Sequence, residues 1–415
     1  MKVAIIGGGF TGLAAGIELL DNGQEVVIFE RDNKLGGLAT GFKEKDWNWS
    51  LETFYHHIFT NDKEIIQMAN KVGMPPIIFS PVTTSFIDNE EIQLDSPISV
   101  LKFKKIDIFS RLWMGAGLMF LKLIPNGLFL EKYQVTVWLP KLIGPKGYQV
   151  IWEKLLKAKF GKYTDEVNMA WFWTRVTKRT QKLGYFEGGF QKLADKMGEY
   201  IVSKRGEIRY QKTITDIKIK AYGYQIEDET FDKVLVTTPM PLAEKLLGKG
   251  VVSWPKLNYL WGQTLILNMN KKIIKGYWMN ILENNWPFLV LVEHTNMVNR
   301  VNYSNQELVY LGNYLEEGDE RLTMSDEKLL MTYLPYLKKI NNNFNREWIE
   351  NIYRFKEPYA QPVMPVNYSK KVPSFVTKLK GVYIANMSMV YPFDRGTNYA
   401  VKMGEEVARL MLCDL

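Results

Sequence analysis

The three histidines of the chain fall in two polar clusters that interrupt otherwise apolar sequence. His56 and His57 are adjacent, and His294 ends an apolar run beside Glu293. An imidazole titrates near about pH 6.5, so it can take up or release a proton at neutral pH, and a neighbouring carboxylate can orient it. We therefore expect these four residues to be catalytic. Successive strand residues point to opposite sides, so we expect His57 to face a ligand and His56 to support it.

Two further polar residues are candidates for binding a substrate. Asn296 follows His294 in its cluster, and Arg395 lies near the C-terminus. Three histidines and a glutamate could also hold zinc, but the sequence lacks two histidines separated by three residues, so we predict no metal site. The alternative to catalysis is that the histidines are core or surface residues with backbone partners. The catalytic hypothesis requires His57 and His294 to face one site from two domains.

The N-terminal stretch predicts the unit that would hold a cofactor near these groups. An apolar run at 3–6 leads into GGGFTG at 7–12, and helix-forming residues follow. The glycines allow a tight turn, a close backbone approach to a pyrophosphate, and close packing of helix on strand. A second strand at 26–29 ends at an acid that suits a ribose. The expected cofactor contacts are Gly7, Gly9, Phe10, Thr11, Gly12, Glu30 and Arg31.

A second glycine turn indicates which dinucleotide binds. The segment 35–40, LGGLAT, extends the motif past the point where a simple NAD unit would end. The sequence therefore favours FAD, with Gly36, Gly37, Leu38 and Ala39 as further contacts. The stretch 30–42 resembles the N-terminal signature of the flavin amine oxidase and phytoene desaturase superfamily, which includes protoporphyrinogen oxidases. The resemblance implies an extended FAD whose adenosine end lies at this unit.

The C-terminal stretch resembles the part of that superfamily that brackets the flavin. A strand at 381–385 precedes GTNYA at 396–400, which opens a helix. The resemblance implies that this helix N-terminus points at the N1–C2=O edge of the flavin, where it favours the anion by on the order of 0.3 to 2 kcal/mol. The family pattern has Gly-Asp after the strand, whereas this chain has Asn386-Met387, so Asp394 or Arg395 is expected to replace the acid. The expected contacts are Asn386, Asp394, Gly396, Thr397, Asn398 and Ala400.

A middle segment completes the resemblance to the superfamily. Residues 212–217, including Ile214, resemble the segment whose backbone meets the adenine, and GYFEGGF at 184–190 resembles the return of the chain into the FAD domain. Ile214 is therefore a further expected contact. Short strands are expected at 208–218, 224–229, 233–237, 261–269 and 308–314, and a helix at 325–339.

The segments between the cofactor motifs change in pattern. The expected elements are a β-hairpin of strands 83–87 and 91–94, and helices at 106–123, 133–142 and 148–160. Asp62 is expected to cap a helix at 63–72. The segment 112–124 is nearly all apolar but too short to span a bilayer. We expect a buried helix there, and the alternative is a membrane-surface patch or the wall of a lipid channel, because basic residues flank the segment.

These segments together predict an α/β fold. A doubly wound, Rossmann-like FAD-binding domain is assembled from residues 1–76, 184–250 and 371–415. A substrate domain with a mixed sheet and helices is inserted as residues 77–183 and 251–370. The 415 residues are too many for one hydrophobic core, and this length suits two or three domains.

The amino-acid composition indicates which cellular compartment and which classes of binding partner to expect. The net charge of +8 favours acidic ligands or an anionic surface, and no nucleic-acid-binding motif accompanies it. The one cysteine, Cys413, excludes an intrachain disulfide and fits a reducing compartment, so a cytoplasmic location is expected. No apolar stretch reaches the ~18 residues of a membrane span, so membrane contact would be peripheral. The oligomeric state stays open.

Three functions remain open at this point. The first is a redox enzyme that passes hydride from a C–H or C–N bond of its substrate to the flavin. The second is a non-redox flavoenzyme, because HHIFTND at 56–62 faintly resembles the histidine loop of UDP-galactopyranose mutases. The third is a non-catalytic scaffold stabilised by FAD. The many aromatic residues suit a flat or isoprenoid substrate, whereas the basic surplus suits a phosphorylated one.

Overall fold

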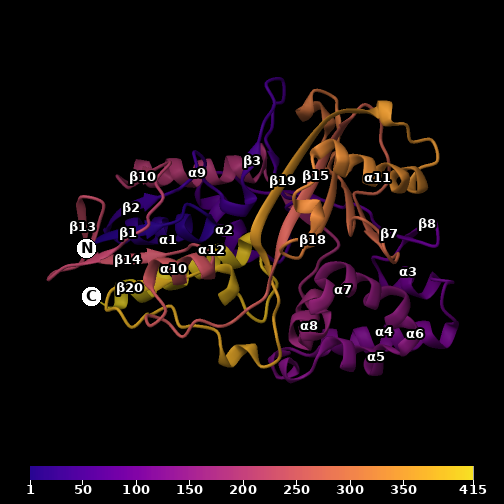
Figure 1. The fold of residues 1–415 in the computed structure, drawn as a ribbon, viewed down its shortest axis with the longest axis horizontal. Helices are drawn as coiled ribbons and strands as arrows, with labels where there is room; N and C mark the ends of the chain where they lie inside the picture. Colours follow the sequence, from indigo (N-terminus) through magenta and orange to yellow (C-terminus); the bar gives the residue numbers. More distant parts are fainter. Residues whose placement is uncertain (415) are drawn as a thin grey trace.

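A five-stranded parallel sheet lies in the part of the molecule that carries both chain ends, at the left in Figure 1. Its order is β10–β2–β1–β14–β20, so the first strand lies in the middle and the chain winds outward in both directions. The predicted doubly wound sheet is confirmed. The strands are β1 (Lys2–Ile6), β2 (Glu25–Phe29), β10 (Glu207–Arg209), β14 (Lys233–Val236) and β20 (Val382–Ile384). The structure is a computed structural model that describes residues 1–414.

Glycines let the helices of this part pack closely. α1 (Phe10–Asp21) packs against α12 (Thr397–Cys413) and α9 (Gly189–Ser203). A Cβ atom on Gly12 would lie 2.0 Å from the carbonyl oxygen of Gly7, and one on Gly404 would lie 2.3 Å from that of Thr11. Larger residues at these two positions would push α1 off its strand and off α12.

A seven-stranded mixed sheet forms the upper right of the molecule (Figure 1). Its order is β19–β15–β18–β17–β16–β7–β8, and its neighbouring strands are antiparallel except for the parallel pair β16 and β7. The predicted hairpin is present as β7 and β8, with Asp88 and Asn89 in the left-handed turn conformation. The strands are β7 (Thr83–Ile87), β8 (Glu90–Gln93), β15 (Tyr259–Met269), β16 (Trp278–Ile281), β17 (Val290–Glu293), β18 (Glu307–Leu315) and β19 (Ile349–Pro362).

Helices complete this second part of the molecule. α11 (Asp326–Ile340) packs beside the mixed sheet, and the side chain of Ser325 caps it by accepting a hydrogen bond from the Lys328 N–H at 3.3 Å. The remaining helices lie below the sheet in Figure 1. They are α3 (Pro97–Lys102), α4 (Ile108–Leu123), α5 (Val135–Ile143), α6 (Pro145–Gly147), α7 (Glu153–Phe160) and α8 (Met169–Thr177).

The helix α4 is not the buried helix that its apolar sequence predicts. Its buried residues are Met114, Gly117 and Leu121, on the side that packs against α5, α6 and α8, whereas Phe109 is 80% and Leu123 is 74% exposed. A helix that is apolar all round usually lies in a core, so burial was the natural expectation. Here one narrow stripe packs, and the rest of the apolar surface faces outward.

Two local expectations also need correction. The strand expected at 208–218 ends at Arg209, because Gln211 takes a left-handed conformation with φ 56° and the chain leaves the sheet edge. Asp62 precedes α2 (Lys63–Lys71) as expected, but its carboxylate accepts a hydrogen bond from the Phe59 N–H at 2.8 Å and none from the helix. Residues 212–217, which follow the left-handed Gln211 and were expected to continue the strand, form a loop.

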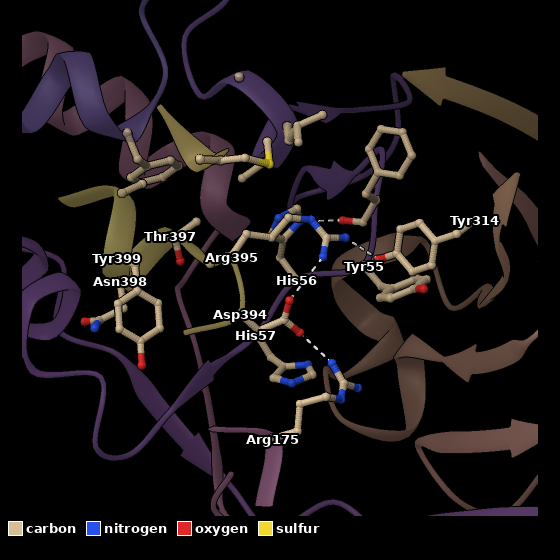
Figure 2. A pocket seen from close by; sticks show the side chains of 18 of the residues that line it. Tyr55, His56, His57, Arg175, Tyr314, Asp394, Arg395, Thr397, Asn398 and Tyr399 are labelled. Carbon is tan, nitrogen blue, oxygen red and sulfur yellow. Dashed lines mark hydrogen bonds and ion pairs between the residues drawn. The ribbon is translucent and has the colours of Figure 1, made fainter. Parts of the chain in front are cut away.

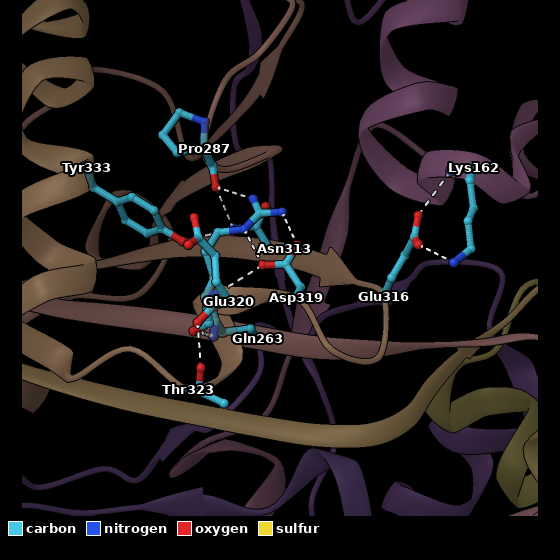
Figure 3. Close-up of polar contacts among 10 residues, drawn as sticks. Lys162, Gln263, Pro287, Asn313, Glu316, Asp319, Glu320, Thr323 and Tyr333 are labelled. Carbon is cyan, nitrogen blue, oxygen red and sulfur yellow. Dashed lines mark hydrogen bonds and ion pairs between the residues drawn. The ribbon is translucent and has the colours of Figure 1, made fainter.

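A salt bridge ties the helices to the mixed sheet (Figure 3). Glu316 follows β18, and its carboxylate pairs with Lys162 Nζ at 2.6 Å and accepts a hydrogen bond from the Lys162 N–H at 3.2 Å. Nearby, Asp319 holds Arg321, whose guanidinium also donates to the Pro287 carbonyl at 3.1 Å. These contacts fix the loop after β18 against the helical layer. Among residues 1–414, no helix is long and apolar enough to cross a membrane.

Candidate active site

One large cavity connects the parallel sheet to the helical layer. Its volume is about 1700 Å³, which exceeds the roughly 300–1,000 Å³ of most ligand pockets. Residues of the N-terminal glycine turns line one end, and α3, α4 and α7 line the other. The cavity therefore has room for an extended cofactor and a second molecule.

The glycine turns form a cradle at the first end of this cavity. Gly9 caps α1 without a side-chain acceptor, so the first N–H groups of the helix are free for an anion. Gly9 forms a β-bridge with Gly36, and a Cβ atom on Gly37 would lie only 3.4 Å from the Gly9 Cα atom. Only a surface without side chains allows a pyrophosphate to approach both turns, and this cradle has that property.

Glu30 lies at the end of β2, where a ribose would meet the sheet. Its two carboxylate oxygens accept hydrogen bonds from the N–H groups of Gly8 at 2.7 Å and Asp32 at 2.9 Å. Burial raises its pKa, although these two hydrogen bonds oppose that shift. Since each carboxylate oxygen can accept more than one hydrogen bond, Glu30 keeps capacity for a sugar diol.

Nearly all of the predicted cofactor contacts line the cavity. Gly12 does not, because it is the glycine that lets α1 pack on the turn. The residues that do are Gly7, Gly9, Phe10, Thr11, Glu30, Arg31, Gly36, Gly37, Leu38, Ala39, Ile214, Asn386, Asp394, Gly396, Thr397, Asn398 and Ala400. Their individual roles stay predictions.

A second helix N-terminus faces the same cavity. Gly396 caps α12 without a side-chain acceptor, and no atom lies within 4 Å of a Cβ built on it. Asn398 is committed elsewhere, since its Oδ1 accepts from the Ile65 N–H at 3.1 Å and its Nδ2 donates to Glu64 at 3.0 Å. The free N–H groups of α12 thus remain available to a negatively polarised edge of a ligand.

His56 and His57 lie between β4 (Leu51–Glu52) and β5 (Ile58–Phe59), and both line the cavity. The His56 Nδ1 atom is 2.7 Å from the Phe54 carbonyl oxygen, so Nδ1 carries the proton and Nε2 is left as an acceptor. Burial lowers the pKa of His56 to about 4 and the pKa of His57 to about 3. Both rings are neutral at pH 7, which corrects the expectation that they titrate near neutrality.

The second polar cluster lies outside the cavity. His294 is 2% exposed in the core, and its Nε2 atom lies 2.9 Å from the Tyr303 hydroxyl. The Glu293 carboxylate accepts hydrogen bonds from the N–H groups of Ile273 at 3.0 Å and Ile274 at 2.9 Å, and burial raises its pKa to about 8. The prediction that His294 shares a site with His57 is wrong, because β17 ends inside the mixed sheet and turns into packed core.

Asn296 also lies outside the cavity lining and has protein partners. Its Nδ2 atom donates to the carbonyl oxygens of Ile274 at 3.0 Å and Gly276 at 2.6 Å, and its Oδ1 atom accepts from Lys272 at 2.6 Å. These contacts use both ends of the amide to fasten the loop before β16. Asn296 is not among the residues that line the cavity, so the expected substrate contact at Asn296 is wrong. Arg395 does line the cavity.

Asp394 lies at the centre of a charged group in the cavity wall (Figure 2). Arg175 Nη1 is 2.5 Å and Lys159 Nζ is 3.8 Å from Asp394 Oδ2, and Arg395 Nη1 is 3.5 Å from Asp394 Oδ1. Burial opposes ionisation of Asp394, but the surrounding cations outweigh it and hold its pKa well below its usual range. Arg395 also donates to Gln361 and to the Tyr314 hydroxyl.

Sequence reasoning missed several residues of this wall. Lys159, Arg175 and Arg179 come from α7, α8 and the loop after α8, and Tyr55 and Tyr314 from the segment before β5 and from β18. Arg175 and Arg179, four residues apart in WFWTRVTKRT at 171–180, were a usable signal, since residues at that spacing lie on one face of a helix. Their meeting with Asp394 depends on tertiary structure alone.

The comparisons with known proteins agree with this geometry. The family of flavin-containing amine oxidoreductases matches residues 10–412. A zeta-carotene desaturase of Capsicum annuum is 38% identical over 73 residues, which are 18% of this chain and 12% of the relative. The chain thus aligns with only about an eighth of the length of that curated relative.

Solved structures share the whole fold. One, assigned as a protoporphyrinogen oxidase from Exiguobacterium sp. 255-15, has a TM-score of 0.78 at 15% identity and covers 99% of this chain and 98% of its own. Another, reduced UDP-galactopyranose mutase, has a TM-score of 0.74 at 12% identity and covers 99% and 95%. At these identities the likeness concerns the fold.

The glycine cradle, Glu30 and the open N-terminus of α12 fit FAD, whose pyrophosphate the N–H groups of α1 would hold and whose flavin the N–H groups of α12 would meet. The family match spans nearly the whole chain. The chain belongs to the family of flavin-containing amine oxidoreductases, its cofactor is FAD, and its class is that of the FAD-dependent oxidoreductases.

Proposed function

We propose that this protein oxidises a largely apolar small molecule by removing hydride from one of its C–H or C–N bonds. The observation that supports the proposal is the continuous cavity, which runs from the cofactor cradle to a chamber among the helices. When bound, FAD supplies the hydride acceptor, its N5 atom. The chain itself supplies orientation, exclusion of water and the hydrogen-bonding groups of the wall.

The chamber beyond the cradle is suited to an isoprenoid or flat substrate. Long apolar side chains from the helices line it. These residues include Leu112, Met114, Leu118, Met119, Ile151 and Leu155. An apolar molecule that enters the chamber would be stabilised there because its apolar surface is removed from water.

The neutral histidines give the wall a hydrogen-bonding function. His56 Nε2 is left as an acceptor because Nδ1 is used by the Phe54 carbonyl, and His57 Nδ1 lies 3.3 Å from the Tyr277 hydroxyl. A neutral imidazole can orient a polar group of the substrate or accept the proton that leaves the atom bonded to the oxidised carbon when the double bond forms. We propose this role for His56 and His57.

Turnover with an electron acceptor tests the proposal. The purified holoprotein is extracted, its bound organic ligands are identified by mass spectrometry, and those ligands are then supplied with an acceptor dye. The proposal predicts consumption of the acceptor and a product that lacks two hydrogen atoms. An enzyme that turns over only when its flavin is reduced beforehand, with no net redox change, would instead be of the mutase type.

We further propose that α4 rests on an anionic membrane surface. Its exposed apolar residues are Ile108, Phe109, Leu112, Trp113, Met119, Phe120 and Leu123. Leu112 and Met119 also line the cavity, so this face adjoins the entrance for an apolar substrate. Exposed lysines at 102, 104 and 122 flank the face and suit anionic lipid head groups.

A further inference from the structure

A surplus of positive charge lies in the cavity wall beside the predicted flavin position. The groups, which we call the basic cluster, are Lys159, Arg175, Arg179 and Arg395. Within residues 1–414, Asp394 is the carboxylate that forms ion pairs with members of this cluster, and it reaches three of them. Three of the four cations therefore share one carboxylate, and the fourth, Arg179, does not pair with it.

Arg179 is the member of the cluster without an acidic partner. No carboxylate of the described residues pairs with it, and no side chain there accepts a hydrogen bond from it. Arg179 is exposed and is one of the residues that line the cavity. The positive charge of the neighbouring Arg175 lowers the pKa of Arg179. This guanidinium can offer its donors to a ligand.

Lys159 is the buried member of the cluster. Lys159 is 8% exposed and lies over the rings of Trp171 and Tyr314, with Nζ 5.1 and 5.0 Å from their centroids. Burial and the neighbouring guanidinium groups lower its pKa well below the usual value, against the opposing effect of Asp394. Neighbouring cations with too few anions repel one another, and a second anion would relieve this repulsion.

We propose that the basic cluster binds an anionic group of the substrate, a phosphate or a carboxylate. The apolar chamber would then hold the rest of the molecule, so the substrate class is an amphipathic one with an anionic head and an apolar tail. The planar guanidinium groups suit both head groups, because each can donate two parallel hydrogen bonds to oxygen. This inference rests on the proposed function only in placing a substrate in the cavity.

Ligand binding to the holoprotein tests the proposal without turnover. Decyl phosphate, decanoate and decanol are titrated separately, and the visible absorbance spectrum of the bound flavin is the readout. The two anions distinguish the head groups, and we expect at least one of them to give a saturable spectral change. Decanol should bind on the order of tenfold or more weakly, since it lacks the charge-assisted hydrogen bonds. Equal binding of decanol would overturn the proposal.

Substitution assigns the effect to the cluster. Arg179→Gln should weaken binding of the anion on the order of tenfold or more while FAD content stays unchanged, and Arg179→Lys should restore part of it. Lys182→Gln is the matched control, because Lys182 is exposed, nearby in the chain and outside the cavity lining. Unchanged affinity in Arg179→Gln, or loss of FAD from it, would contradict a substrate-anion site. Failure of the redox proposal would leave these results unaffected.

Discussion

Glu52 is a buried carboxylate next to the histidine segment. Its two oxygens accept hydrogen bonds from the Tyr185 hydroxyl at 2.6 Å and the Phe190 N–H at 2.7 Å, and its carbonyl accepts from the Tyr310 hydroxyl at 2.7 Å. It thereby connects α9 of the cofactor part with β18 of the mixed sheet. Burial raises the pKa of Glu52 from 4.5 to about 7, against the opposing effect of its hydrogen bonds.

Glu52→Gln is expected to change how stability depends on pH. In the wild type, the folded state holds a proton that the unfolded state loses at lower pH, so stability is lost as pH rises from about 4.5 to about 7. The loss attributable to this group is about 3 kcal/mol at most. Glutamine resembles the protonated carboxyl, so the variant should lose less stability across that window, as followed by urea unfolding at each pH. A parallel loss in both proteins would show that Glu52 does not titrate there.

Replacing His57 and His294 separates a cavity residue from a core residue. His57→Ala should retain FAD and lower turnover roughly a hundredfold, as a lost acid–base or orienting group does. His294→Ala should leave a core cavity and lose on the order of 3 kcal/mol of unfolding free energy, with turnover per folded molecule unchanged. Urea unfolding and steady-state rates measure the two effects. A larger loss of turnover in His294→Ala, at equal folded fraction, would contradict this assignment.

The sequence allowed the place of a residue in the fold to be predicted where a motif defined its environment. Gly9, Glu30 and Gly36 were predictable, because a glycine turn between strand and helix allows few other arrangements. His294 was not, because a polar residue at a strand end can face a cavity or turn into the core, and the sequence contains no information on which side β17 would pack.

Among the elements, α1 depends most on a single glycine. Gly12→Ala would bring its Cβ to 2.0 Å from the Gly7 carbonyl oxygen, so α1 must shift and the phosphate cradle with it. We expect loss of FAD binding together with lower thermal stability. Gly115→Ala is the matched control, because it is also a glycine inside a helix but has no atom within 4 Å of its Cβ. That control should gain up to about 1 kcal/mol from helix propensity. Retained FAD in Gly12→Ala would refute the packing argument.

The exposed face of α4 can be tested with vesicles. Phe109→Ser combined with Leu123→Ser removes the two most exposed apolar side chains of α4, at 80% and 74%. We expect binding to anionic phospholipid vesicles at low salt to fall on the order of tenfold per residue, as measured by co-sedimentation. Tyr222→Ser combined with Val202→Ser is the control, since these side chains are 92% and 59% exposed on other elements. If the wild-type protein stays in the supernatant when the vesicles are sedimented, that result would contradict the membrane proposal.

The elements also show where pattern reading fails. The strand–turn–helix unit and the closing strand and helix were predictable because their periodicity and glycines agree. The outward face of α4 was not, because an apolar helix surface looks the same in sequence whether protein or lipid covers it.

At the scale of the whole molecule, the site is assembled from distant segments. Arg175, Asp394 and the glycine turns lie hundreds of residues apart, yet they line one cavity between the two sheets. The resemblance to a family predicted the FAD end of that cavity. The basic cluster could not be predicted, because α7, α8, the loop after α8 and the loop before α12 meet only in the folded chain.

The central claim is that the substrate in this cavity gives hydride to the flavin. The most direct measurement is the visible absorbance of the FAD-saturated protein, under anaerobic conditions, while its identified ligand is added. We predict loss of the oxidised-flavin absorbance together with a product that lacks two hydrogen atoms. A ligand that binds while the flavin stays oxidised and the ligand stays unchanged would contradict the claim.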